Sequence, residues 1–207
     1  MRTLLGRANS SNVMKVIWLL EELRLPYDRR DIGGPFGGTA TAEYRALNPN
    51  GVIPTLVEDG FSLWESNVIL RYLAAAHAPG HPVWPADQRA RAQVDCWMDW
   101  QQTTLNRPQA TVFQGLVRIA PDRRDHAAIA AALDDLRLHY GLLDRLLATR
   151  QYIAGDVLTL ADLAIGVHVH RWFSFDVPRP SQPHLRAWYE RLLGRPAYSL
   201  HVAQPMT

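Results

Sequence analysis

The chain has 207 residues, a formal net charge of +2 and 47% hydrophobic residues, which is the composition of a globular protein with a substantial buried core. It has no run of 18 apolar residues, and its arginines are scattered and form no basic stripe, so we expect it to bind neither membrane nor nucleic acid. The single cysteine, Cys96, cannot form an intrachain disulfide, so we expect a cytoplasmic protein in which Cys96 is a small buried apolar residue.

The first part of the chain alternates predicted strands with a predicted helix. Residues 3–5 and 27–32 are the two strands. Between them, residues 13–23 carry apolar side chains at helical spacing, and Pro26 ends this helix. The cluster Ser10-Ser11-Asn12 lies where the N-cap of the helix is expected. These segments form a βαβ unit.

A second group of segments follows a glycine-rich loop. Residues 41–47 are predicted to form a short helix. Residues 55–57 and 61–63 are predicted strands, and the Asp59-Gly60 pair between them is typical of a tight hairpin turn. A further helix is predicted over 66–77. The order is αββα, so the complete pattern of this part is βαβαββα.

The remainder of the chain is predicted to be helical. Residues 79–86 form a linker, because the prolines in it cannot continue a helix. Asp87 is placed to cap a long helix, which we expect Pro108 to bend or break. Residues 129–147 carry apolar side chains at alternating spacings of four and three, which is the most regular amphipathic pattern in the chain.

The start of another helix is marked by a capping motif. Thr159 can cap the helix, and Asp162, three residues later, can accept a hydrogen bond from the N–H of the cap residue. Leu158 and Leu163 occupy the two positions of a hydrophobic staple. Taken alone, this motif indicates only where a helix begins.

The most informative stretch combines residues 48–57, which include Ile53-Pro54, with the sequence Trp64-Glu65-Ser66-Asn67. The order turn, X-Pro, strand, tight turn, strand, Glu-Ser and helix resembles the glutathione-binding half of glutathione transferases. The capping motif at Thr159 and the predicted helix within 183–196 resemble their helical half. The chain is most similar to cytosolic, serine-type bacterial members of the theta-, beta- or nu-like kind.

Two domains are predicted, residues 1–78 and 87–207, joined by the linker 79–86. The resemblance implies an α/β plus all-α fold, with an N-terminal thioredoxin-like domain followed by an all-helical domain. It also implies a homodimeric detoxification enzyme in which the thiolate of the co-substrate glutathione attacks a small hydrophobic electrophile. Two alternatives stay open: a glutathione-dependent disulfide or peroxide reductase using the same site, and a non-catalytic ligand-binding module.

The residues Ser10, Ser11 and Asn12 are the candidate catalytic group. Local sequence alone favours a capping role for them. The resemblance implies that Ser10 donates a hydrogen bond to the thiolate and that Asn12 also contacts the sulfur, with Ser11 as the alternative to Ser10. No tyrosine or cysteine precedes the helix, so a tyrosine-type or mixed-disulfide mechanism is not expected.

Four residues are candidates for binding the remainder of glutathione. The resemblance implies that Pro54 is a cis-proline, which turns the backbone N–H and C=O of Ile53 toward the cysteinyl part of the ligand. Ser66, at a helix start, can offer its N–H and hydroxyl to a carboxylate, and Glu65 can balance an ammonium group. This pair therefore suits the γ-glutamyl end. For the glycyl carboxylate, the only candidates are weak: the loop 33–41 and Asn50 are near in sequence, but none of them is a cation.

The second substrate is expected between the two domains. Sequence alone favours a core or surface position for each candidate, and the candidates are Arg7, Phe36, Trp97, Gln101, Thr104, His168 and Trp172. His168 and His170 are two residues apart and do not share a helix face, so we expect no metal site.

Overall fold

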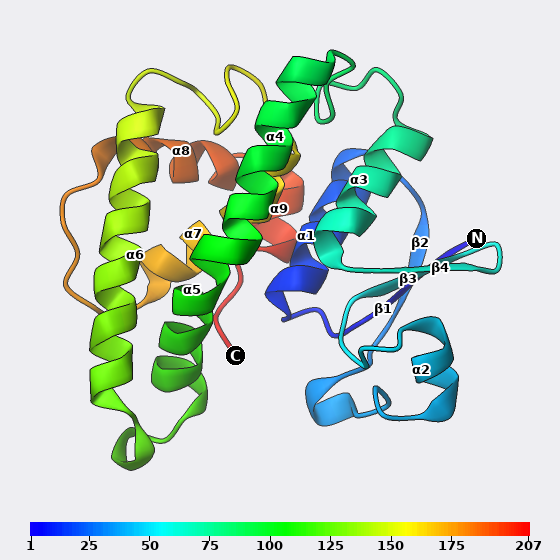
Figure 1. Ribbon diagram of the computed structural model, residues 1–207, viewed down its shortest axis with the longest axis horizontal. Coiled ribbons are helices and arrows are strands. Elements are labelled where there is room, and N and C mark those ends of the chain that lie inside the picture. Colours follow the sequence, from blue (N-terminus) through cyan, green and yellow to red (C-terminus); the bar gives the residue numbers. More distant parts are fainter.

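In the computed structural model, which describes residues 1–207, a four-stranded sheet lies at one side of the molecule and a group of helices at the other (Figure 1). The strands are β1 (Arg2–Leu5), β2 (Tyr27–Arg30), β3 (Thr55–Glu58) and β4 (Phe61–Trp64). Their order in the sheet is β2-β1-β3-β4, with β1 parallel to β2 and antiparallel to β3, and β3 antiparallel to β4. The predicted thioredoxin-like arrangement is confirmed.

Short local signals in the sequence set several of these elements. Asp59 and Gly60 both have positive φ, 50° and 85°, and they join β3 to β4 as a two-residue hairpin turn with the predicted Asp-Gly pair. Strand β3 ends one residue later than predicted, at Glu58. The predicted second strand is too long, because β2 ends at Arg30. The helices of this part are α1 (Ser11–Glu22), α2 (Ala42–Leu47) and α3 (Ser66–His77), with a short 3₁₀ segment over Gly34–Phe36.

The helical part contains α4 (Gln88–Trp100), α5 (Asn106–Phe113), α6 (His126–Leu147), α7 (Leu160–Ser174), α8 (Pro183–Leu193) and α9 (Pro196–His201), with a short 3₁₀ segment over Pro121–Arg123. Helix α7 is its centre, since α1, α4, α5 and α8 all pack against it. Asp87 caps α4 by accepting a hydrogen bond from the N–H of Ala90, as predicted. None of the helices combines the length and apolar composition that a membrane crossing requires.

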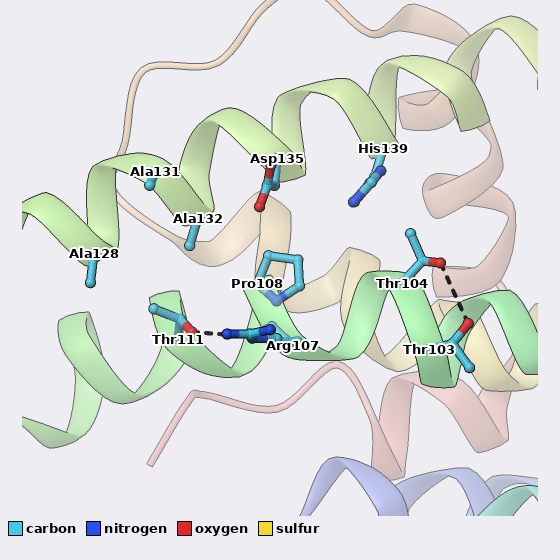
Figure 2. Close-up of a pocket in the computed structure, with 10 residues that line it drawn as sticks. All are labelled: Thr103, Thr104, Arg107, Pro108, Thr111, Ala128, Ala131, Ala132, Asp135 and His139. Carbon is cyan, nitrogen blue, oxygen red and sulfur yellow. Dashed lines mark hydrogen bonds between the residues drawn. The ribbon is translucent and has the colours of Figure 1, made fainter.

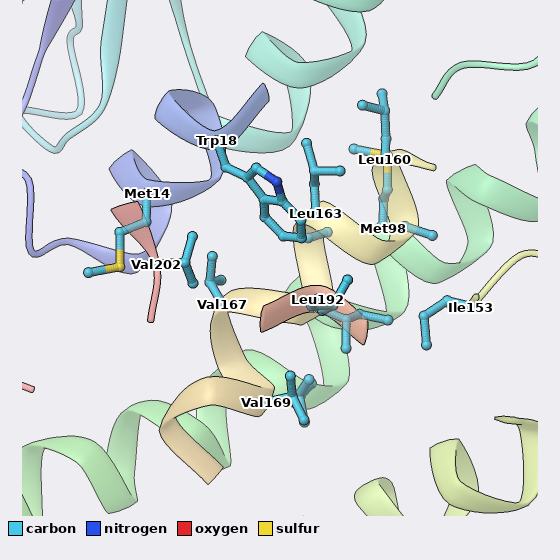
Figure 3. Close-up of a cluster of buried hydrophobic side chains, with 14 of the residues drawn as sticks. Met14, Trp18, Met98, Ile153, Leu160, Leu163, Val167, Val169, Leu192 and Val202 are labelled. Carbon is cyan, nitrogen blue, oxygen red and sulfur yellow. The ribbon is translucent and has the colours of Figure 1, made fainter. Parts of the chain in front are cut away.

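The contact between α1 and α7 joins the two parts of the molecule. Figure 3 shows Trp18 of α1 beside Leu163 of α7. A Cβ at Gly166 of α7 would lie only 2.9 Å from the Trp18 ring, so the absence of a side chain there permits the close approach. Tyr198 of α9 packs edge-on against the same ring and donates a hydrogen bond to the Gly166 carbonyl. Because α3, α7 and α9 all pack against α1, every residue from Val13 to Leu20 is buried.

The expected break at Pro108 does not occur. Pro108 lies inside α5, and the five residues before α5, Gln101–Leu105, form a wider π-helical turn in which the N–H of Asn106 bonds the Gln101 carbonyl. The helical path from α4 to α5 therefore continues. Proline has no backbone N–H to donate, and the wider turn before Pro108 allows the helix to continue without that hydrogen bond. A second π-helical segment, Gln114–Arg118, follows α5.

The capping motif before α7 is confirmed and is more extensive than predicted. Oδ2 of Asp162 accepts hydrogen bonds from the N–H of Thr159 at 2.8 Å and from its hydroxyl at 3.0 Å. Oδ1 accepts from the N–H of Ile153 at 2.9 Å and from the indole N–H of Trp188 at 3.0 Å. Asp162 is completely buried. Its carboxylate thus connects α7, α8 and the loop before α7.

Candidate functional site

The N-termini of α1 and α3 meet at one place in the structure. The hydroxyl of Ser66, the first residue of α3, donates a hydrogen bond to Oδ1 of Asn12 in the first turn of α1, at 3.3 Å. A helix N-terminus carries backbone N–H groups without partners and a partial positive charge. Two such termini facing one space make a site that favours negatively charged groups.

The two serines at the start of α1 have free hydroxyls. Ser10 has the extended backbone of an N-cap, with φ −83° and ψ 125°, but its side chain forms no capping hydrogen bond. The capping role that the local sequence favours is therefore not the role of the Ser10 side chain. Both hydroxyls are only half-buried, so either can bond to a ligand, and Ser11 stays an alternative to Ser10.

The segment before β3 presents an open backbone edge. The Ile53–Pro54 peptide is cis, as the family resemblance implies. Neither the N–H nor the C=O of Ile53 has a hydrogen-bond partner within the protein. The Ile53 side chain is held against Gly33, where a Cβ would lie 3.1 Å from the isoleucine Cδ1. A bound peptide can therefore pair with this edge as a neighbouring strand would.

Glu65 adopts a backbone conformation that is rare for a residue with a side chain. It is the N-cap of α3, with φ 71° and ψ 109°, and such conformations cost about 1–3 kcal/mol and cluster at functional sites. Its carboxylate is exposed and forms neither a capping hydrogen bond nor an ion pair. The group is thus available to a cationic part of a ligand beside Ser66.

A buried polar network lies beneath Ser66. The ammonium of Lys15, the only lysine, donates to Oε1 of Gln101 at 2.9 Å, and to Oδ1 of Asn67 and Oγ of Ser66 at 3.4 Å each. Lys15 is completely buried. Burial lowers the pKa of Lys15 to about 7; the charge of Glu65 opposes this shift, and that of Arg171 on α7 adds to it.

The π-helical turn positions the far end of this network. Gln101, its first residue, is buried and bonds both Lys15 and Nε2 of His168, the latter at 2.9 Å. Burial, together with the charges of Lys15 and Arg171, holds the pKa of His168 well below its usual value, so its imidazole is neutral. Because π-helical turns are frequent at functional sites, this turn is a structural signal that the sequence pattern does not carry.

Lys15 was missed by the sequence analysis, although a signal for it exists. The stretch from Val13 to Leu20 contains no other polar residue, and a helix that is apolar on every side is buried on every side. A lone lysine within such a helix must therefore be buried too, and a buried cation needs acceptors.

The candidates for the second substrate are distributed over different environments. Trp172 is in the core, stacked on Tyr140, and Gln101 and His168 belong to the buried network. Phe36 is exposed, and Trp97 packs against Trp100. Arg7 lies close to Ser10, because its carbonyl accepts a hydrogen bond from the Ser10 N–H.

Two features lie away from this junction. Cys96 is exposed on α4, so the expectation that it is buried is wrong; it points away from the neighbouring helices, unlike Val94 and Met98 of the same helix. A groove of about 590 Å³ runs between the start of α5 and α6 and is lined by Thr103, Arg107, Asp135 and His139 among others (Figure 2). No residue of this groove belongs to α1 or α3.

Two family models match the chain. Residues 9–76 match the model of the glutathione S-transferase N-terminal domain, and residues 95–196 match that of the C-terminal domain. The matched ranges contain the α1–α3 junction and the helices that pack behind it.

Individual relatives agree with the family models. Glutathione S-transferase GstB of Escherichia coli is 39% identical over 209 residues, covering 100% of both chains. Glutathione S-transferase 3 of Zea mays is 33% identical over 97% of this chain and 92% of its own. A theta class glutathione S-transferase from Xanthomonas axonopodis pv. citri, solved with glutathione bound, superposes with a TM-score of 0.95 at 44% identity, covering 100% of this chain and 99% of its own. The chain belongs to the glutathione S-transferase family.

Proposed function

We propose that the protein is a glutathione S-transferase that binds glutathione where α1 and α3 begin and stabilises its thiolate for attack on an electrophile. The observation that carries this proposal is the contact between Asn12 and Ser66, which brings two helix N-termini to one space beside the free hydroxyl of Ser10. The bacterial relative with glutathione bound supports the choice of ligand.

The cysteinyl and γ-glutamyl parts of glutathione each have a matching group around this space. The backbone of Ile53, which has no partner within the protein, pairs with the cysteinyl residue after the cis-proline Pro54. The γ-glutamyl carboxylate binds the N–H and hydroxyl of Ser66 at the start of α3. The ammonium group beside it binds the free carboxylate of Glu65. This arrangement directs the thiol toward the start of α1.

Ser10 and Asn12 then stabilise the ionised sulfur. A thiol of pKa about 8.5 is only a few per cent ionised at neutral pH. A hydrogen bond to a charged group contributes about 1.5–3 kcal/mol, and a helix N-terminus about 0.3–1 kcal/mol. At 1.36 kcal/mol per unit, these contributions lower the thiol pKa by roughly one to three units. The thiolate becomes the main species without any proton-accepting residue.

The test is binding and turnover measured together. We expect thermal stabilisation by glutathione and S-hexylglutathione, and conjugation of glutathione to chlorodinitrobenzene. Turnover of hydroxyethyl disulfide or cumene hydroperoxide with no conjugation would replace this function by that of a reductase. Retention of glutathione with no turnover of any acceptor would leave only a binding module.

We extend the proposal to the organisation of the protein: domains of residues 1–78 and 87–207 joined by the linker 79–86, a cytoplasmic location, and a homodimer. Phe61 on β4 and Val68 on α3 support the dimer, since they are large apolar side chains with 48% and 41% of their surface exposed. Light scattering is expected to give the mass of two chains, and that of one chain for Phe61→Glu. If the unmodified protein has the mass of a single chain, the proposed homodimer is wrong.

The lowered pKa of Lys15 predicts that ligand binding takes up protons. Its pKa is about 7 in the free protein, so at about pH 8 it is mostly neutral. A carboxylate that binds at Ser66 favours the ammonium form of Lys15 and raises its pKa. Binding therefore takes up protons at pH values between the pKa of Lys15 in the free protein and its pKa in the complex. We expect uptake of roughly half a proton or more per site at about pH 8, measured by calorimetry in two buffers of different ionisation enthalpy.

The ligand in this experiment is S-methylglutathione, because it has no thiol proton to release. Lys15→Met is the matched variant and should show little or no uptake. Equal uptake by Lys15→Met and the unmodified protein would assign the proton to another group.

A further inference from the structure

Three arginines near Ser10 have no acidic partner. Arg7 precedes α1, Arg118 ends the second π-helical segment, and Arg171 lies on α7. None of the three forms an ion pair. The arginines that do form ion pairs are Arg2, Arg29, Arg30, Arg71, Arg137 and Arg195. The cluster Arg7–Arg118–Arg171 therefore gathers three positive charges that no Asp or Glu side chain pairs with.

Two of these guanidinium groups share one aromatic ring. The Cζ of Arg171 lies 3.9 Å from the centre of the Phe113 ring, and that of Arg118 lies 5.4 Å from the same centre. The ring stabilises cations but supplies no hydrogen-bond acceptor. Arg171 has no hydrogen-bonded partner, although it is half-buried on the helix that forms the centre of the molecule.

Arg7 and Arg118 are joined through the end of the chain. Arg7 donates to Oδ1 of Asn9 at 2.5 Å, and Asn9 donates to the hydroxyl of Thr207 at 2.7 Å. Arg118 donates to the carbonyl oxygen of Thr207 at 2.5 Å. The Nε of Arg7 is buried with no partner. A backbone oxygen of Thr207 is thus the acceptor that Arg118 has found, and donors remain on all three side chains.

The three charges affect one another. Burial and the charges of Arg7 and Arg118 lower the pKa of Arg171 to about 10, and burial with the charge of Arg118 lowers that of Arg7. Arginine side chains are cationic at neutral pH. The one group that opposes this shift in Arg171 is the hydroxyl of Tyr140, which is buried and whose own pKa is raised well above its usual value. An anion placed among the three would relieve their repulsion.

The cluster adjoins the start of α1, where the thiolate is proposed to lie. Arg7 is bonded to Ser10 through the backbone. Arg171, Phe113 and Thr207 line one small cavity with Met14, which lies one turn into α1. The end of the chain reaches this place between α1 and α5 (Figure 1).

We propose that the second substrate carries a carboxylate or another anionic group, which Arg7, Arg118 and Arg171 bind while its electrophilic carbon faces the thiolate at Ser10. This inference deepens the proposed transferase function and replaces the purely hydrophobic electrophile expected from the sequence. In the reaction, the thiolate sulfur forms a bond to carbon, the bond from that carbon to the leaving halide breaks, and the halide departs with the bonding electron pair. The thiol proton has already passed to solvent, and the anionic group is unchanged.

Binding is tested first, with unreactive probes that differ in one charge. The protein loaded with S-methylglutathione is expected to bind dinitrobenzoate at least tenfold more tightly than dinitrobenzamide in calorimetry. Arg171→Met should remove most of this preference, and Arg118→Gln, an exposed position that does not threaten folding, should reduce it several-fold. Arg107→Gln is the matched control, because it removes an exposed arginine of the distant groove.

Turnover is tested second, with a chlorodinitrobenzoate and its carboxamide, which share the ring and the leaving chloride. We expect the ratio of kcat/KM for acid over amide to fall at least tenfold in Arg171→Met and to stay constant in Arg107→Gln.

Equal binding of the acid and the amide by the unmodified protein would overturn the proposal. Weaker binding of S-methylglutathione by Arg171→Met and Arg118→Gln would also overturn it, by assigning the arginines to the glycyl carboxylate. A binding preference for the acid without any turnover would retain the anion site and reject the transferase function.

Discussion

Replacement of Ser10 by alanine is expected to lower kcat for conjugation at least tenfold, with a much smaller change in glutathione affinity. The lost hydrogen bond to a charged sulfur is worth about 1.5–3 kcal/mol, which corresponds to roughly one to two units in the pKa of the bound thiol. The rate should therefore recover as pH rises toward the new thiol pKa. Steady-state kinetics across pH, together with the ultraviolet absorbance of the thiolate, measure both effects.

Two matched variants complete this experiment. Ser11→Ala removes the neighbouring hydroxyl, which is equally free of hydrogen bonds, and is expected to leave the thiol pKa close to its original value. Ser66→Ala is expected to weaken glutathione binding more than it slows the chemical step. A large loss in Ser11→Ala with none in Ser10→Ala would exchange the roles of the two serines.

Replacement of Asp162 by alanine is expected to lower the free energy of unfolding by about 3 kcal/mol or more at neutral pH. The change leaves four donors of the buried network without an acceptor, on Thr159, Ile153 and Trp188. Urea unfolding followed by circular dichroism measures the difference. Asp125→Ala is the matched control, because Asp125 caps α6 at an exposed position and its loss should cost about 1 kcal/mol.

The pH dependence of the same variant has a defined sign. Burial raises the pKa of Asp162 to about 6, above its value of 3.8 in an unfolded chain. The folded protein therefore retains a proton that the unfolded chain releases, and this contribution to stability is complete below the unfolded pKa and is lost as pH rises through about 6. The difference between Asp162→Ala and the unmodified protein should be larger at about pH 5 than at about pH 7. A difference that grows with pH would contradict a raised pKa.

Local sequence signals account for much of the fold. The bounds predicted for α3 agree with the structure, because Pro79 and the polar Glu65-Ser66 pair limit that helix from both ends. The β3–β4 turn and the caps at Asp87 and Thr159 were also predictable, since each depends on a few adjacent residues. These features do not depend on what packs against them.

Features that depend on tertiary contacts could not be predicted in the same way. The passage of the helix through Pro108 needs a π-helical turn, and the first residue of this turn, Gln101, belongs to a buried network with Lys15, which lies far away in the sequence. The exposure of Cys96 depends on which face of α4 the other helices cover. For the candidate site, the start of each helix was predictable from its own local sequence. The contact between Asn12 and Ser66 was not, because these residues are 54 positions apart in the sequence and meet only in the folded chain.

The burial of Lys15 also makes the protein a simple subject for chemical labelling. Its only side-chain amine is inaccessible, so amine-reactive reagents should modify the exposed terminal amine of Met1 and attach the protein to a surface in one orientation. The slow rate at which Lys15 is modified would then report how often α1 separates from α3. A bound ligand that holds the two helices together should lower that rate.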